Sequence, residues 1–453
     1  MISKVEQSFN TNSTYEISAP KKQEAPILTA PILERKSSAL TNTAAYSPSF
    51  CAKLRSKEEQ EKYNLIVKNV DSETRAKLNS LLKKGVLLNN NSNDKSTVLD
   101  NLYKIASEPR IKGLETSNIL KETITAIENP YTITQNFGDV PTEIADNLVK
   151  NSGGSFNKDD LQVHSASCVA TSIEFNLADK KPAEFTRMAA GLSSENYSVT
   201  KKIKVSDIAD NTVDAFWLLN EFNMQYKMND WNNVEVTLKP DRNAIIRSRI
   251  QTSYKDPLER SSVDVLLQST FMNIGSQNTY DSLTDVRTGK YNPDNRGLTD
   301  IEKNFAETIA EGQPKISLTY QILDENERIT GYECDFATIQ KHLLNALHSG
   351  NNIIIGYTQT DETKKVINGH EITIIGAEKS LDGKIIFICN DTDDDKSEPI
   401  KWAADDLIPK IHHAGLPKEA VKDDVEFTEA WKEVIAMYKE VKENPGNNQQ
   451  IAA

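Results

Sequence analysis

The stretch NGHEITIIGAEKSLDGKIIFICND, residues 368–391, decides the fold of the second half of the chain. An isoleucine-rich run that begins at Ile372 and a second apolar run, 385–389, have the composition of β-strands. Between the two runs lies Asp382-Gly383, a dipeptide that favours a tight two-residue turn. The stretch therefore predicts a β-hairpin.

Both ends of this hairpin carry polar residues, and the stagger of the two runs places His370 and Asn390 at the same end. The pair is either the polar end of an ordinary hairpin or the base and orienting residue of a catalytic site. Upstream, residues 335–348 have the apolar spacing of a helix with Asp335 as its N-cap. Residues 353–355 then form a buried strand. A helix, a strand and a hairpin thus follow one another.

A candidate nucleophile lies in DDLQVHSASCVATSIEFNLADKK, residues 159–181. Apolar residues keep helical spacing from Ser167 onward, which places Cys168 in the first turn of the predicted helix. The unpaired N–H groups and the positive end of the helix dipole stabilise a thiolate at that position. Gln162 precedes Cys168 by six residues, and its amide together with the Cys168 backbone N–H can form a two-donor oxyanion hole.

These motifs together resemble the papain-like cysteine peptidases. The resemblance rests on the order Gln, Cys, His, Asn, on the Gly-His that opens a strand, and on a following strand that ends in Asn. It implies that Cys168 is the nucleophile and His370 the general base and acid. Asn390 would orient the imidazole and Gln162 would donate to the oxyanion. The implied fold class is α+β, with a two-lobe catalytic domain.

The sequence departs from the family pattern at several positions. Val169 replaces the usual aromatic residue after the nucleophile, and Asn390-Asp391-Thr392 replaces an Asn-Ser-Trp run. These features are similar to the divergent bacterial branches, including the bacteriocin-processing type, in which an aspartate can orient the histidine. Asp391 is therefore an alternative orienting residue. Because neighbouring strand residues point to opposite faces, only one of the two can face the imidazole.

The chain divides into four predicted regions. Residues 1–55 are rich in Ser, Thr, Asn, Pro and Lys and are predicted to be a disordered tail, as are residues 441–453. Residues 56–150 contain four short amphipathic helical patterns and predict a small helical bundle. Residues 151–440 are the expected catalytic domain, with an insertion at about 200–330. The bundle is interpreted either as an inhibitory pro-segment or as a module that docks a partner.

Composition excludes several classes of function. The net charge of −13 argues against nucleic-acid binding, which needs a basic surface. The four cysteines are scattered without metal-ligand or disulfide spacing, so free thiols are expected and neither a metal nor an organic cofactor is implied. No signal peptide and no apolar run long enough to span a membrane is recognisable, which leaves the cytoplasm as the default location.

The predicted function is thiol-dependent hydrolysis of peptide or amide bonds in a protein or peptide substrate. Two alternatives stay open: acyl transfer or deamidation of the transglutaminase type, and a catalytically inactive binding module on the same fold. His164 is a competing base, although it lacks an orienting residue. Elsewhere, residues 208–226 predict a helix, residues 263–272 predict a buried helix, and His412-His413 are expected at the surface.

Overall fold

The structure is a computed structural model that describes residues 53–136, 166–253, 259–290, 300–393 and 398–421, with six isolated residues between these ranges. Of the predicted tails, the described part contains only residues 53–55. Helices and sheets are both abundant, which confirms the α+β class. Within this part, none of the helices combines the length and the apolar character needed to cross a membrane.

The four predicted N-terminal helices are confirmed. They are α1 (Lys57–Lys68), α2 (Ser72–Lys83), α3 (Val98–Ser107) and α4 (Thr116–Glu128), with the short 3-10 turns η1 (Val86–Leu88) and η2 (Pro130–Thr132). Ser56 and Glu59 form a capping box at the start of α1. The N-cap of α2 is Asp71, whose carboxylate accepts the backbone N–H of Thr74. Gly85, at φ 80°, follows α2 and ends it.

The next helices continue the same helical part. They are α6 (Cys168–Lys180), α7 (Pro182–Leu192), α8 (Val205–Ile208), α9 (Thr212–Glu221), α10 (Ala244–Ser253), α11 (Ser262–Gly275) and α12 (Asp300–Glu311). A small antiparallel sheet of order β1-β3-β2 joins them, made of β1 (Val199–Lys204), β2 (Gln225–Met228) and β3 (Asn233–Leu238). Every residue of α11 is buried, which confirms the buried helix predicted at 263–272.

The helix predicted over 208–226 is wrong at both ends: Ile208 ends the separate helix α8, and α9 begins only at Thr212. The helix α9 stops at Glu221, and Asn223 adopts the left-handed conformation with φ 51°. Asparagine tolerates that conformation better than most residues, so the chain turns back there. Tyr226 consequently lies on β2, opposite Val236 of β3.

The sheet part contains a six-stranded antiparallel sheet of order β10-β9-β8-β7-β11-β4. Its strands are β4 (Lys315–Thr319), β7 (Ile353–Thr360), β8 (Val366–Lys379), β9 (Ile385–Asn390), β10 (Ile400–Ala403) and β11 (Ile411–Pro417). Also present are the hairpin β5 (Gln321–Leu323) and β6 (Ile329–Tyr332), the helices α13 (Phe336–His348) and α14 (Ala404–Leu407), and the turns η4 (Ile408–Lys410) and η5 (Lys418–Ala420). The predicted hairpin is confirmed as β8 and β9, and Gly383 has φ 88° in its turn.

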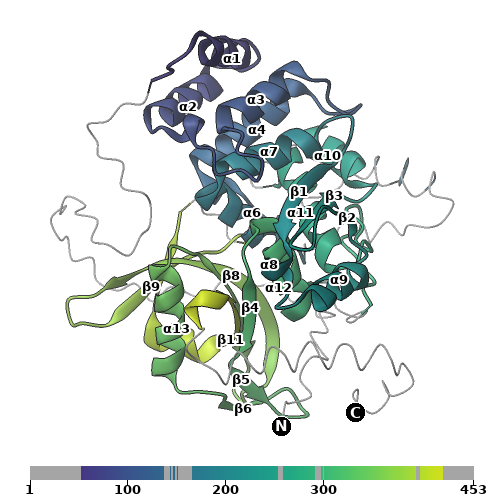
Figure 1. The fold of residues 1–453 in the computed structure, drawn as a ribbon. Coiled ribbons are helices and arrows are strands. Elements are labelled where there is room, and N and C mark those ends of the chain that lie inside the picture. Colours follow the sequence, from purple (N-terminus) through teal and green to yellow (C-terminus); the bar gives the residue numbers. More distant parts are fainter. Residues whose placement is uncertain are drawn as a thin grey trace.

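Two hydrophobic cores hold these parts together. One core joins residues of α1–α4 with residues of α6, α7, α11 and α12. The other lies between the six-stranded sheet and α13. Figure 1 shows the helical part above the sheet part, with α6 at the junction between them. The helix α6 contacts β8, and α12 contacts β4 and β11.

The contact between α12 and the sheet is made by buried charges. Lys315 of β4 forms ion pairs with Glu307 at 2.7 Å and with Glu311 at 3.1 Å. One turn earlier on α12, Lys303 pairs with Glu371 of β8 at 3.2 Å. All five side chains are buried. The sequence pattern of α12 did not show that its charged stripe faces a sheet.

Replacing Lys315 with methionine is expected to lower the free energy of unfolding by about 3–5 kcal/mol, because it leaves buried carboxylates without their counter-charge. Denaturant unfolding followed by circular dichroism measures this effect. Lys384→Met is the matched control: Lys384 pairs with Asp405 at the exposed surface, and its loss should leave stability close to wild type. Adding Glu307→Gln to Lys315→Met should restore part of the loss. An equal, small effect of both lysine substitutions would contradict this account.

The expectation that His412 and His413 lie at the surface is wrong. Both are buried on β11, which is an interior strand between β7 and β4. His413 Nε2 lies 2.7 Å from a carboxylate oxygen of Glu371. Gly356 of β7 makes room for the ring, since a Cβ there would lie 2.6 Å from His413 Nε2. The two histidines are thus part of the charged contact between the sheet and α12.

Candidate active site

Cys168 is the first residue of α6 and is partly exposed. The two residues before it are anchored from elsewhere in the helical part. The Ser167 hydroxyl donates to Gln268 Oε1 of α11 at 3.2 Å, and the Ala166 N–H donates to the Asp285 carboxylate. Because the first N–H groups of a helix have no intrahelical acceptor, the backbone N–H of Cys168 is a candidate donor to an oxygen of a ligand. The predicted position of Cys168 in the first turn of a helix is confirmed.

His370 lies on β8, between β7 and β9. Its Nε2 is 2.7 Å from Oδ1 of Asp391, and both side chains are largely shielded from solvent, with 12% and 18% exposed. The edge of the His370 ring meets Tyr357, the opposite residue on β7, with centroids 5.7 Å apart. The carboxylate and the aromatic ring fix the plane of the imidazole.

Cys168 lies close enough to the His370 ring to raise the pKa of that imidazole, beside Asp391 at Nε2. Burial alone would lower the pKa of His370, but the hydrogen bonds to Asp391 and to Cys168, together with their charges, raise it well above the ordinary value. Burial also raises the pKa of Asp391, yet the His370 contact outweighs it and the net shift is downward. The environment therefore favours an imidazolium beside a carboxylate.

The structure brings Asp391, and not Asn390, to the imidazole. Asn390 is the last residue of β9, pairs with Thr373 of β8, and is buried. Within the described residues, its amide nitrogen has no hydrogen-bond partner. Consecutive residues at a strand end point in opposite directions, so the one that faces His370 depends on where the strand stops. Here β9 ends at Asn390, so Asp391 is the first residue after the strand.

The loop that carries Asp391 is held by a segment far away in the sequence. The Gln135 N–H and the Thr134 hydroxyl both donate to the Thr392 carbonyl, at 3.0 and 3.1 Å. The Thr392 hydroxyl in turn donates to Gln135 Oε1 at 3.2 Å. The Asp393 N–H donates to Asp391 Oδ1 at 3.1 Å. Thr134 and Thr392 are 258 positions apart, and no motif in the sequence signals their contact.

Beneath α6, Gln268 connects the start of the helix to the same distant segment. Its side-chain nitrogen donates to Glu174 Oε2 and to the Thr134 carbonyl, each at 2.9 Å. Burial raises the pKa of Glu174 well above its ordinary value, and the neighbouring Asp264 carboxyl raises it further. Sequence reasoning missed this buried acid pair because each carboxyl lies within an otherwise apolar helix.

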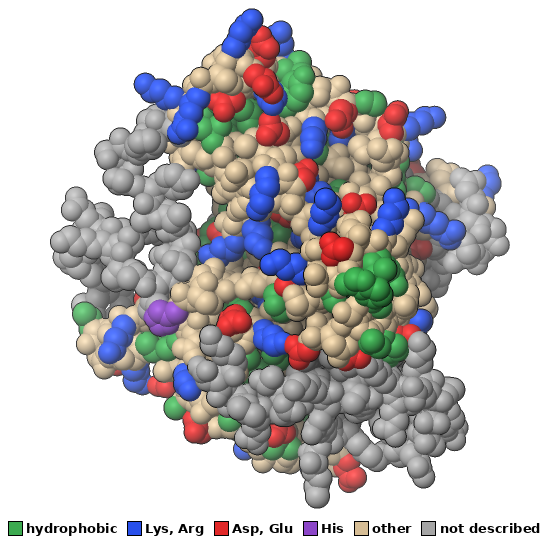
Figure 2. Space-filling view, viewed as in Figure 1, with side chains coloured by type: hydrophobic (Ala, Val, Ile, Leu, Met, Phe, Trp, Pro, Cys, Tyr) green, Lys and Arg blue, Asp and Glu red, His purple; other side chains and the backbone are tan. Residues whose placement is uncertain are grey.

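A polar hollow at the other end of α6 is too far away to be the thiol site. It is lined by residues of α6, α12 and the turn before β7, among them Lys180 and Asn352. Figure 2 shows Lys and Arg side chains gathered across the middle of this face, where the helical part meets the sheet part. At the rise of an α-helix, Lys180 lies roughly 18 Å from Cys168, so the hollow and the thiol are separate places on the molecule. The Lys180 amine at the hollow is paired with Asp179 at 3.2 Å.

Two predicted residues lie outside the described residues: Gln162, the expected oxyanion donor, and His164, the competing base. The described residues contain no group of three or more His, Cys, Asp or Glu side chains able to hold a metal ion. The groups that meet at the start of α6 are therefore Cys168, His370 and Asp391. These groups can form a nucleophile, a proton shuttle and an orienting carboxylate. Comparison of the chain with family models, with curated proteins and with solved structures finds no match among them.

Proposed function

We propose that this protein is a thiol-dependent hydrolase of peptide or amide bonds. The observation that carries the proposal is that the His370 ring bonds the Asp391 carboxylate through Nε2 and interacts with Cys168, the first residue of α6. A thiol at a helix N-terminus beside a buried, carboxylate-bound imidazole is the arrangement that covalent catalysis by cysteine requires. A structural cysteine has no need of such a partner.

The mechanism follows from these contacts. His370 takes the proton of Cys168, and the thiolate attacks the carbonyl carbon of the substrate. The negative charge that develops on the carbonyl oxygen is stabilised by the Cys168 backbone N–H, and we include the Gln162 amide as the second donor. The His370 imidazolium then returns its proton to the leaving amine, and the thioester remains on Cys168. Water activated by His370 hydrolyses the thioester and restores the thiol.

The arrangement of the fold supports a papain-like, two-lobe catalytic unit. The nucleophile comes from the buried helix α6 of the helical part, and the base comes from the antiparallel sheet. The proposed orienting residue follows the strand next to that of the base. In this proposal the helical lobe and the sheet lobe each contribute one half of the site, which lies where they meet.

A peptidyl epoxide tests the proposal, because it alkylates a thiolate that an imidazolium assists. Mass spectrometry should find the label on Cys168 much faster than on Cys334, a partly exposed cysteine of the sheet part. His370→Ala should abolish the fast labelling. His348→Ala, a histidine exposed at the end of α13, should leave it unchanged. Equal labelling of wild type and His370→Ala would contradict the proposal.

The products of a glutamine-containing peptide library incubated with an added amine identify the reaction. Hydrolysis leaves shorter chains, whereas acyl transfer leaves an amine adduct and deamidation leaves a glutamate. Fast labelling of Cys168 together with cut peptides supports the hydrolase. An amine adduct without cut peptides would replace it by the transferase alternative.

A further inference from the structure

The helical region of residues 54–136 shares a single hydrophobic core with the helix of the nucleophile. Leu102 of α3 and Ile124 of α4 are fully buried in the same cluster as Val169 of α6 and Phe185 of α7. Burial of a large apolar side chain contributes roughly 1.5–3 kcal/mol. Separation of the two sets of helices would expose many such side chains at once. The region therefore does not behave as an independent bundle resting on a catalytic domain.

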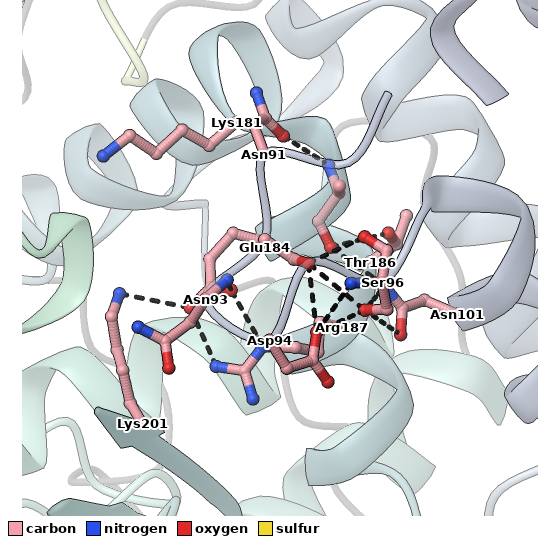
Figure 3. A network of polar contacts seen from close by, with 12 residues as sticks. Asn91, Asn93, Asp94, Ser96, Asn101, Lys181, Glu184, Thr186, Arg187 and Lys201 are labelled. Carbon is pink, nitrogen blue, oxygen red and sulfur yellow. Dashed lines mark hydrogen bonds and ion pairs between the residues drawn. The ribbon is translucent and has the colours of Figure 1, made fainter. Parts of the chain in front are cut away.

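A buried polar network joins the same two sets of helices. Its centre is Glu184 of α7, whose carboxylate accepts from Arg187 at 2.8 and 2.9 Å and pairs with Lys201 of β1 at 3.1 Å. The backbone N–H of Asn93, in the loop before α3, donates to Glu184 at 2.8 Å. Figure 3 shows how this loop lies against α7 and β1. Burial raises the pKa of Glu184, but the charge of Lys201 and the Arg187 contact outweigh it and lower the pKa strongly.

The neighbouring residue Asn91 completes the attachment at the end of α6. Its side-chain nitrogen donates to the Lys180 carbonyl at 2.8 Å, and its side-chain oxygen accepts from the Ala183 N–H at 3.2 Å. The amide thus satisfies two backbone groups at the junction of α6 and α7. Loss of residues 54–136 would leave these groups and Glu184 without their partners.

The C-terminal end of the helical region reaches the catalytic loop itself. After η2 the chain runs through Thr134 and Gln135, which make three hydrogen bonds with Thr392, the residue next to Asp391. Gln268 fixes Thr134 from below and also contacts Ser167, the residue before the nucleophile. One segment is thereby connected to both halves of the candidate site.

We propose that residues 54–136 are a permanent part of the catalytic unit, and that Thr134 and Gln135 are positioning residues that hold the Asp391 loop against His370. This inference rests on the proposed function for its catalytic meaning. It replaces the two interpretations that the sequence left open, a removable pro-segment and a separate docking module. A cut that removed the region would expose the shared core and release the loop of Asp391.

The test is the titration of His370 in a double variant, Thr134→Val with Gln135→Leu. The first substitution removes the hydroxyl donor to Thr392, and the second removes the acceptor of the Thr392 hydroxyl, with little change in volume. Ring-labelled histidine and NMR give the pKa of His370 in the full-length protein, assigned with His370→Ala. The groups that face this ring are Asp391, Cys168 and Tyr357.

A loosened loop weakens the pairing with Asp391, so the pKa of His370 should fall toward its ordinary value. The rate of alkylation of Cys168 by iodoacetate, which an imidazolium assists, should then decline at lower pH than in the wild type. Thr132→Val is the matched control, because its exposed hydroxyl donates only to Asn129 within η2. In that variant His370 should titrate as in the wild type. Replacing Thr134→Val by Thr134→Ser in the double variant keeps the hydroxyl donor, so the pKa of His370 should return part of the way to its wild-type value.

A titration of His370 that the double variant leaves unchanged overturns the positioning role, as does an equal shift in Thr132→Val. Should the double variant fail to fold, Thr134→Val alone, which deletes one hydrogen bond, gives the same readout. Neither measurement needs a substrate. If Cys168 of the wild-type protein is alkylated fast but the protein cleaves no peptide, the hydrolase proposal is overturned. The titration of His370 in the variants would still test the role of Thr134 and Gln135.

Discussion

Cys168→Ala is expected to abolish hydrolysis, with a loss in kcat on the order of a millionfold, as measured when the nucleophile of a comparable triad is removed. The thiol is the proposed nucleophile, and Cys168 and Asp391 are the side chains whose contacts raise the pKa of His370. His370→Ala should cost about as much, because an un-ionised thiol is a weak nucleophile. The double variant should be no worse than either single one, since the two groups act as a unit. Steady-state cleavage of a responsive peptide measures these losses, and a count of free thiols checks that each variant has lost only the intended cysteine.

The matched control for the thiol is Cys334→Ala, in which a partly exposed cysteine of the sheet part is removed. It should retain the wild-type rate. Thermal unfolding of Cys168→Ala should stay close to that of the wild type, because the side chain is partly exposed and packs at the edge of the core rather than among its buried residues. Full activity of Cys168→Ala would show that the reaction does not run through this thiol.

Asp391→Ala is expected to reduce kcat by about 10⁴-fold, the order of loss found when the orienting carboxylate of a triad is removed. The carboxylate fixes the ring through Nε2 and keeps it charged. Because the contact raises the pKa of His370, removal of the carboxylate lowers that pKa toward its ordinary value. The imidazolium then loses its proton at lower pH, so the alkaline limb of the pH–rate profile shifts to lower pH. A pH–rate profile of kcat/KM measures this shift.

Asn390→Ala provides the comparison that separates the two candidate orienting residues. Asn390 makes no described side-chain hydrogen bond with His370, and its amide nitrogen has no described partner. Its removal should lower kcat by less than about tenfold, the scale of a general perturbation of packing at the site rather than of a lost orienting contact. A loss in Asn390→Ala as large as that in Asp391→Ala, with the alkaline limb shifted, would assign the orienting role to the amide.

Local patterns predicted the elements that carry the site. Asp382-Gly383 specifies the turn of the hairpin, and Asp335 specifies the start of α13 through its side-chain cap. The helical spacing from Ser167 onward placed Cys168 in the first turn of the helix, and α6 begins at Cys168. Each of these signals lies within a few residues of the structure that it determines, which is why it can be read from the sequence.

The remainder depends on packing between distant segments. The choice between Asn390 and Asp391 depends on the residue at which β9 ends, which strand propensity does not fix. The burial of His413 depends on the position of β11 inside the sheet and on the absence of a side chain at Gly356. The contact of Gln135 with Thr392 joins two loops without a shared pattern. Such contacts are decided by the tertiary fold.

The charged contact between α12 and the sheet has a consequence for motion. Cys168 belongs to one side of this contact and His370 to the other. Any hinge opening of the two sides would pull Lys315 away from Glu307 and strand both charges in a medium of low polarity. Gly415 leaves room for Glu307, since a Cβ at this position would lie 2.5 Å from its carboxylate oxygen. If the proposed hydrolase is correct, we expect the two sides to stay together during turnover, with Cys168 and His370 already side by side before a substrate binds.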